Sequence, residues 1–307
     1  MKILRIQLKR NIKLFFKDKG LFFTSLITPL ILLVLYATFL AGVYEDSFVM
    51  ALSQGGTLDI SYIDQRIING CVSGQLVSSI LAVSCVTVSF CSNMLMVQDK
   101  FSGARKDFAI SPIKPSILSL SYYLSTLVST LIICLCAAAV CCVYMAFVGF
   151  YMSALDVFLL LVDVFLLVMF GTVISSVVNF FLNTQGQVSA VGSIVSSCYG
   201  FISGAYMPIS QFPEGLRTVI SFLPGTYGTS LLRSHALRGA ISALRNSGAS
   251  ESSIATVSDV VDSNIYFFGN EVGNTEKYLV LIISTFVLLG IYVLMNVLSY
   301  KKAKNEK

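Results

Sequence analysis

The sequence predicts an all-α integral membrane protein with six transmembrane helices, and three observations carry that prediction. The 307 residues are 55% hydrophobic and only 12% charged, whereas a soluble domain carries about a quarter charged residues. Apolar runs long enough to cross about 30 Å of hydrocarbon, roughly 20 residues each, recur along the chain. Fifteen of the 21 Lys and Arg residues fall in three short stretches between or beside those runs.

Residues 1–19 predict an amphipathic helix that lies on the membrane surface. Basic side chains recur every three or four residues from Lys2 to Lys17, while Leu4, Leu8 and Ile12 line another face. Such a helix rests in the headgroup plane with its basic side toward anionic lipid. A signal peptide is the alternative, but the apolar run that follows is too long and lacks a clear A-x-A cleavage site.

Six apolar segments follow this helix, and each is expected to cross the membrane once. The first is expected to be kinked near Pro29, because proline disrupts a helix interior. The second is rich in Ser and Gly in its first half, which is typical of helices that approach one another closely. The expected spans are residues 21–43, 67–97, 116–148, 155–182, 188–207 and 278–300.

The distribution of charge predicts the orientation of these spans. Cytoplasmic loops retain excess Lys and Arg, and six crossings place the three basic stretches and both termini on one side. Ten acidic residues fall in the segments between the other ends of the spans. We therefore expect a multi-pass protein of the cell membrane with both termini cytoplasmic. The basic residues flank apolar spans, so membrane lipids are the expected anionic partner, and nucleic acid is not.

Two longer segments are expected on the outer side, at residues 44–66 and 208–276. The first is polar and acidic. Within the second, the stretch 211–243 is moderately apolar, but each Arg at mid-bilayer would cost about 2.5 to 3.5 kcal/mol. We expect two short helices that dip into the outer leaflet, which is an extracellular re-entrant hairpin before the last span. Residues 246–276 are expected to form an exposed loop.

Asp163 is the residue that costs most to place in hydrocarbon. Intramembrane acids usually face a bundle interior or a wet cavity, so Asp163 is either a hydrogen-bonded structural acid or an acid that lines a pathway. Asp156 lies seven positions earlier on roughly the same helical face and is expected to be a solvated helix end. Asn179, in the same span, is a further candidate buried polar residue, and Asn296 is expected to bond across helices in the last span.

Neither a metal site nor a catalytic centre is expected. The eight cysteines fall in the expected spans and form no C-x-x-C pair, so we interpret them as packing residues. His235 lies between Arg233 and Arg238 and is expected at the surface, with the arginines reaching toward outer headgroups. The chain has no G-x-x-x-x-G-K-[ST] sequence, so it is not expected to be an enzyme or to hold a nucleotide cofactor itself.

The basic segment 98–115, QDKFSGARKDFAISPIKP, is expected to form a short projection between the second and third spans. It places Phe108 and Ile110 beside charged residues. Pro112 and Pro115 fix where the third span begins, because proline suits a helix start. A rigid projection can carry force from a soluble motor to two spans at once. The alternative is a solvated loop that is basic only because of the topology.

Two local patterns can be defined by the order of their residue types. The loop has an acid–base cluster, a glycine, a second acid, an apolar patch and Ser-Pro, at Asp99, Lys100, Gly103, Asp107, Phe108, Ile110, Ser111 and Pro112. The segment 203–233, SGAYMPISQFPEGLRTVISFLPGTYGTSLLR, has a glycine, two prolines, an apolar stretch, Pro-x-Thr-Tyr and an arginine, at Gly204, Pro208, Pro213, Pro224, Thr226, Tyr227 and Arg233.

Together with the layout of spans, these patterns resemble the membrane subunit of type-2 ATP-binding-cassette exporters. That permease family includes drug-resistance and polysaccharide or glycolipid exporters. The resemblance covers essentially the whole chain, 1–307, as a single transmembrane permease domain. In one respect the chain departs from it. Family members often carry Gly-Thr with an acid three positions after the Gly, whereas here Ala104 follows Gly103 and Asp107 falls four positions after.

The resemblance implies two permease copies, or one copy and a homologue, that pair with two cytoplasmic ATPase subunits holding ATP and Mg. It implies that the 98–115 loop couples to those subunits and that the second and fifth spans line the permease interface. Few charges lie along the spans, so an amphiphilic or lipid-linked cargo or drug is expected to leave the cell. The alternative is an ATP-independent carrier, channel or scaffold. A carrier should show paired broken helices in two halves, and no internal repeat is evident.

Overall fold

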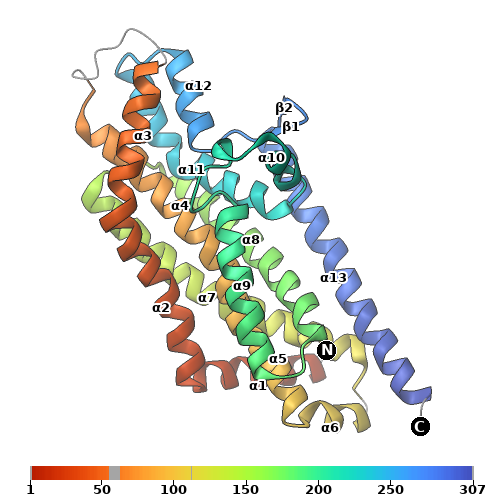
Figure 1. Cartoon of the computed structure of the whole chain (residues 1–307). Helices are drawn as coiled ribbons and strands as arrows, with labels where there is room; N and C mark the ends of the chain where they lie inside the picture. The colour runs from red at the N-terminus through yellow and green to blue at the C-terminus, as the bar shows by residue number, and fades with distance from the viewer. Residues whose placement is uncertain (1, 55–62, 112, 306–307) are drawn as a thin grey trace.

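A computed structural model describes residues 2–54, 63–111 and 113–305, which form an elongated bundle of helices (Figure 1). The N-terminal helix, α1, is amphipathic and packs against α7 and α2. The helices are α1 (Lys2–Lys17), α2 (Lys19–Leu35), α3 (Ala41–Gln54), α4 (Gln65–Ser92), α5 (Met94–Phe101), α6 (Ala104–Ile110), α7 (Pro115–Val148), α8 (Ala154–Phe181), α9 (Gln185–Ile202), α10 (Glu214–Ser221), α11 (Pro224–Asn246), α12 (Glu251–Val260) and α13 (Asn274–Asn305). One antiparallel hairpin joins β1 (Tyr266–Phe267) to β2 (Asn270–Glu271).

Five helical segments of the described chain are long and apolar enough to cross a membrane. They are Lys19–Ser53, Gln65–Phe101, Pro115–Val148, Ala154–Phe181 and Asn274–Tyr300. The fifth span expected from the sequence, residues 188–207, corresponds to α9, which is outside this group because Gln, Ser and Gly make it less apolar. α9 nevertheless packs along α4 and α5 within the bundle. The expected count of six spans is therefore not confirmed.

The core of the bundle is α4, which is buried along nearly its whole length and packs against α2, α7, α8, α9 and α11. Small residues allow this close packing. A Cβ on Gly74 would lie 2.9 Å from the carbonyl oxygen of Ala236 in α11, and a Cβ on Gly171 of α8 would lie 2.9 Å from that of Cys85. The expected enrichment of small residues in this span is thus explained by contacts within one chain.

The structure corrects two expectations for the segments between spans. Residues 44–54 are helical rather than a polar loop, because α2, a π-helical turn at Tyr36–Leu40 and α3 run on without a break. Pro29 lies inside α2, so the kink expected near it stays a prediction. Residues 246–276 contain α12 and the hairpin, with Ile254 and Val257 buried. The loop at 55–62 lies outside the described residues.

The two ends of the bundle differ in charge. One end, here called the basic end, holds α1, α5, α6 and the last turns of α13; the other, the acidic end, holds α10, α11, α12 and the hairpin (Figure 1). The basic stretches of the sequence fall at the first end and most acidic residues at the second. Instead of two short helices before the last span, the acidic end has α10, of 8 residues, and α11, of 23 residues.

Candidate functional site

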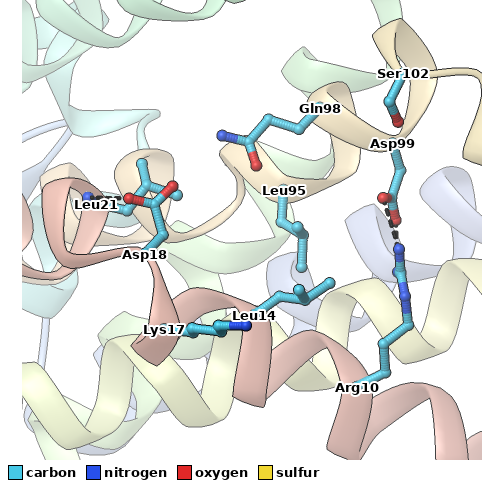
Figure 2. Close-up of a pocket in the computed structure, with 9 residues that line it drawn as sticks. All are labelled: Arg10, Leu14, Lys17, Asp18, Leu21, Leu95, Gln98, Asp99 and Ser102. Atoms are coloured by element: carbon cyan, nitrogen blue, oxygen red, sulfur yellow. Dashed lines mark hydrogen bonds and ion pairs between the residues drawn. The ribbon is translucent and has the colours of Figure 1, made fainter.

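The expected coupling loop begins in a network of charged side chains at the basic end. Arg10 of α1 donates two hydrogen bonds to Asp99 of α5, with Nη1–Oδ2 and Nη2–Oδ1 distances of 2.7 and 2.9 Å (Figure 2). Tyr122 of α7 donates a third to Asp99 Oδ2 at 2.6 Å. The hydrogen bond to Asp99 raises the pKa of the Arg10 guanidinium above its usual value. This network joins the surface helix, the loop and the third span.

A crevice of about 530 Å³ lies beside this network, between α1, the start of α2 and α5 (Figure 2). Arg10, Lys17 and Gln98 line it, and Asp18 caps α2 by accepting a hydrogen bond from the backbone N–H of Leu21. Capping by an acid satisfies an otherwise free N–H at the start of a helix. The elbow between α1 and α2 is therefore a defined turn that faces the loop.

Lys100 ties the same loop to α8. Its Nζ donates to the carbonyl oxygens of Asn179, Phe180 and Leu182 at 3.0, 2.6 and 2.8 Å. A cation at this position satisfies the free carbonyls at a helix C-terminus and opposes the helix dipole. Asp99 and Lys100 were both expected to couple to an ATPase. In the structure both make contacts within the chain: Asp99 binds α1 and α7, and Lys100 binds the end of α8.

The tip of the loop has the local structure that its glycine requires. Gly103 has a φ of +83° and precedes α6, a backbone conformation that costs other residues about 1 kcal/mol or more. Ser111 Oγ donates to the carbonyl oxygen of Phe108 at 2.7 Å after the last turn of α6. The projection expected here contains the short helix α6. Pro112 and the side chain of Ile110 lie outside the described residues.

The exposed residues of this tip differ from those singled out in the sequence. Phe108 turns inward, and the guanidinium carbon of Arg10 lies 5.2 Å from the centre of its ring. Asp107 is exposed, and so is Phe101, which has 75% of its surface free. The sequence analysis did not select Phe101. Its position between Lys100 and the Ser102–Gly103 pair, in a polar segment, was a usable signal, because exposed aromatic side chains often mark binding surfaces.

A second polar cluster explains Asn179 and introduces Asn93. Asn93 separates α4 from α5, and its Nδ2 donates to Ser175 Oγ and Ser176 Oγ, each at 3.0 Å. Asn179 Nδ2 donates to the carbonyl oxygen of Asn93 at 3.4 Å. The expectation of a buried, cross-helix role for Asn179 is confirmed. Asn93 was missed because a single Asn in an apolar run gives no indication of its partners.

Asp163 lies in a closed polar cluster between α8, α11 and α13. Its Oδ2 is 2.6 Å from His235 Nδ1, and Tyr278 OH donates to its Oδ1 at 2.6 Å. Asp163 is fully buried and His235 is 5% exposed. The surface position expected for His235 is therefore wrong. Of the two readings for Asp163, these bonds favour the structural acid.

Asp156 is also buried, which corrects the expectation of a solvated helix end. It forms a capping box with Ser153 at the start of α8, and its side-chain oxygen accepts from the Ser153 backbone N–H at 2.9 Å. Its other oxygen lies 3.5 Å from Arg238 Nη1. Arg238 has a side chain that is 58% exposed, so of the two arginines beside His235 this one reaches outward as expected.

Arg233 does not reach the surface. It is fully buried in α11, and it donates to the backbone carbonyl of Gly204 and to Asp262 Oδ2, the latter at 3.1 Å. Asp262 also accepts from the backbone N–H groups of Ile209 and Ser210 at 2.6 and 3.2 Å. Burial raises the pKa of Asp262, and the charge of Arg233 opposes that rise. This cluster ties three separate segments of the acidic end together.

The remaining residues of the second pattern shape α10 and α11. Pro208 and Pro213 precede a 3-10 turn and α10, and Pro224 occupies the first turn of α11, where its missing N–H is tolerated. Thr226 Oγ1 and Tyr227 OH donate to the carbonyl oxygens of Ile220 and Ser221 at 3.3 and 2.6 Å. These bonds fold α10 back on α11, so the pattern encodes a helical hairpin.

A polar groove of about 700 Å³ runs between α2, α4 and α9. Its polar lining is uncharged except at Asp18, and its lining includes Thr24, Thr87, Gln98, Gln185, Ser189, Ser193, Ser196 and Ser197. α9 exposes much of its surface, including Ser189, Ser193 and Ile194. The second span was expected at a permease interface, but α4 reaches this groove only near its end. The exposed wall comes from α2 and α9.

These features define a polytopic membrane protein with polar junctions at both ends of its helix bundle. Among the described residues, no three His, Cys, Asp or Glu side chains lie close enough to hold a metal ion. The model of the ABC-2 type transporter family matches residues 3–237. The chain therefore belongs to the ABC-2 type transporter family. Its members are membrane components of transporters and work with ABC ATPase subunits. Among curated proteins, none matches the chain significantly.

Proposed function

We propose that this chain is the membrane-spanning permease subunit of an ABC exporter, driven by ATP that a separate subunit binds with Mg and hydrolyses. The observation that carries the proposal is the junction of Arg10, Asp99 and Tyr122, together with Lys100 at the end of α8. Any displacement of the loop tip is transmitted through these bonds to α1, α7 and α8. An ordinary solvated loop would need no such connections.

The proposed docking surface for the ATPase is the tip formed by Phe101, Ser102, Gly103 and Asp107. Phe101 and Asp107 are exposed, whereas the side chains of Asp99 and Lys100 form hydrogen bonds within the chain. We assign those two residues the role of positioning the tip. The basic end is then cytoplasmic, in agreement with the excess of Lys and Arg found there, and both termini lie in the cytoplasm of a protein of the cell membrane.

A second permease copy, or a homologue, is proposed to cover the exposed face of α9. Ser189, Ser193 and Ser197 recur at helical spacing on that face, and small polar residues allow close helix–helix contact in a membrane. On this arrangement α9 is the sixth crossing, supported by a partner instead of by its own apolarity. α10 and α11 then form a re-entrant hairpin at the outer leaflet, held by Arg233.

The groove of α2, α4 and α9 indicates the class of cargo. Its lining combines hydroxyl and amide groups with apolar walls and carries one charged side chain, that of Asp18. A small anion would find no positive side chain there, and a small cation would find only the Asp18 carboxylate, which already caps α2. We therefore propose an amphiphilic or lipid-linked substrate or a drug that is moved outward.

Co-purification tests this function. The full chain is expressed with the ATPases of its host and extracted in mild detergent, and it is expected to retain an ABC ATPase. Phe101→Ala is expected to lose the ATPase. Phe147→Ala, the matched change at an exposed position of α7, is expected to retain it. Transport into inverted vesicles should stop when ATP is removed. Retained transport without ATP would favour the ATP-independent carrier or channel, and labelling of exposed Lys114 from outside the cell would refute the orientation.

A further inference from the structure

A separate cavity at the basic end has the chemistry of a phosphate site. It encloses about 430 Å³ between α6, the start of α7, the end of α8 and the end of α13. We call it the inner pocket and define it by Lys100, Arg105, Phe108, Phe180, Asn296 and Ser299. It does not share a lining residue with the groove of α2, α4 and α9. The proposed transport path therefore leaves it unexplained.

The inner pocket has positive charge and no acid among its lining residues. Lys100 and Arg105 both line it. The three hydrogen bonds of Lys100 all go to the end of α8, so this residue contributes charge and little else. Arg105 Nη2 donates to Asn296 Oδ1 at 3.2 Å, and within the described residues this is its one hydrogen bond to a side chain. No other N–H group of the guanidinium donates to a described residue, so these groups can bind a ligand.

The start of α7 adds to the preference for an anion. Ile113, Pro115 and Leu118 line the same pocket, so a helix of 34 residues begins on its wall. Lys114 precedes that helix without a side-chain cap, and its first turn contains no acid. Pro115 has no N–H, and Ile117 and Leu118 donate to the Lys114 carbonyl oxygen, so the helix dipole rather than a set of free N–H groups favours a negative group at this end. This feature supports a site that the cavity and Arg105 already define.

The other walls indicate what the anion is attached to. Phe108, Phe180, Ile113 and Leu118 make part of the pocket apolar. α13 presents exposed apolar side chains, Leu294 and Leu298 among them, along the turns that lead to Ser299. A free phosphate ion gains nothing from such walls, whereas the glycerol and acyl parts of a phospholipid bury apolar surface there.

We propose that the inner pocket binds a phosphate group through Arg105, and that an anionic phospholipid of the cytoplasmic leaflet supplies it. The location in that leaflet rests on the orientation given under the proposed function. Lys100 and Arg105 belong to the 98–115 loop, so an occupied pocket holds the loop against α8 and α13. Lipid composition would then set how firmly the loop is positioned before any partner docks.

The test is a binding measurement on the purified full chain in neutral detergent, without ATP and without an ATPase. Phosphatidylglycerol is expected to raise the melting temperature in a saturable way, and phosphatidylcholine is expected to leave it unchanged. Arg105→Gln should weaken the apparent affinity for phosphatidylglycerol about tenfold, as expected for a hydrogen bond to a charged group. Arg217→Gln, at an exposed position of α10, is the matched control and should bind as the parent does.

Each arm separates one explanation. Saturation by inorganic phosphate alone at a similar concentration would identify a soluble anion as the source and overturn the lipid assignment. Equal shifts with both lipids, or undiminished binding by Arg105→Gln, would overturn the site. If Arg105→Gln does not purify as a single species, Arg105→Lys keeps the charge but loses the fork that binds two oxygens, and it should bind several-fold more weakly. Because no ATPase is present in this experiment, none of these outcomes decides whether the chain is an exporter subunit.

Discussion

The acidic and basic ends of this bundle both use an Arg–Asp pair to fasten chain segments, but the two pairs differ in their access to water. At the acidic end the side chains of Arg233 and Asp262 are 1% and 6% exposed. At the basic end the side chain of Arg10 is 32% exposed and that of Asp99 is 6% exposed. A buried pair is costly to separate, because each ion is left without water. A pair whose arginine is partly exposed can exchange its partner for water at smaller cost.

This contrast suggests that one end of the bundle is held rigid and the other can rearrange. Arg233 and the Asp163–His235–Tyr278 cluster hold α11 in a fixed relation to α4, α8 and α13. The Arg10–Asp99 pair holds α1 to the loop strongly enough to order it, yet can rearrange. The acidic end is therefore expected to act as an anchor and the basic end as a joint. Four substitutions test that comparison, given in order of their expected effect on stability.

Arg233→Met is expected to have the largest effect. It leaves Asp262 and the carbonyl of Gly204 without their charged partner inside the protein, and breaking a buried pair costs about 3–5 kcal/mol. The melting temperature in detergent should fall sharply. Arg238→Met is the control, because its pair with Asp156 is more than half exposed on the arginine side. Similar melting temperatures for the two variants would contradict the idea of an anchor at this end.

Asp163→Leu should destabilise the chain less, but still clearly. His235 loses its buried hydrogen-bond partner, at about 1–3 kcal/mol for a stranded buried group. Tyr278 also loses this partner, but its side chain is only part-buried and adds less. His235→Leu alone strands Asp163, and the double variant should cost less than the sum of the two single changes. Additive losses in a thermal double-mutant cycle would mean that the two side chains do not act as a pair.

Arg10→Ala separates stability from coupling. Its pair is partly hydrated, so the expected loss of stability is about 1 kcal/mol. Cargo-stimulated ATP hydrolysis by the complex should nevertheless fall severely, because α1 is released from the loop. The exchanged pair, Arg10→Asp with Asp99→Arg, should recover part of the stimulation. A loss of stability as large as that of Arg233→Met, with coupling intact, would reverse the roles assigned to the two ends.

Phe101→Ala should leave stability unchanged, because its side chain is largely exposed. The expected effect is on the concentration of ATPase needed to form the complex, since exposed aromatic residues are frequent binding anchors. Titration of the purified ATPase, with melting temperature recorded in parallel, measures both quantities. An unaltered titration would remove Phe101 from the docking surface while leaving the joint at Arg10 in place.

The residues that were placed correctly from the sequence are those whose role depends on near neighbours in the chain. Pro115 begins α7 as expected, and the long apolar runs are helices, because backbone preference and hydropathy act over a few residues. The expectations that were wrong concern contacts across the chain. Arg233 and His235 were expected near the surface, yet their partners lie 29 and 72 positions away, and no local pattern announces such a partner.

Composition, hydropathy and charge by themselves determined that this chain is a multi-helix membrane protein with a basic end and an acidic end, because a membrane sorts residues by transfer energies that each segment carries alone. The tertiary structure decided which charges are buried and with whom they pair. It placed Asp99 and Lys100 in contacts within the chain at the basic end, left Phe101 exposed, and brought Arg105 to the start of α7. Those outcomes depend on how the helices pack against one another, and packing is a property of the whole chain.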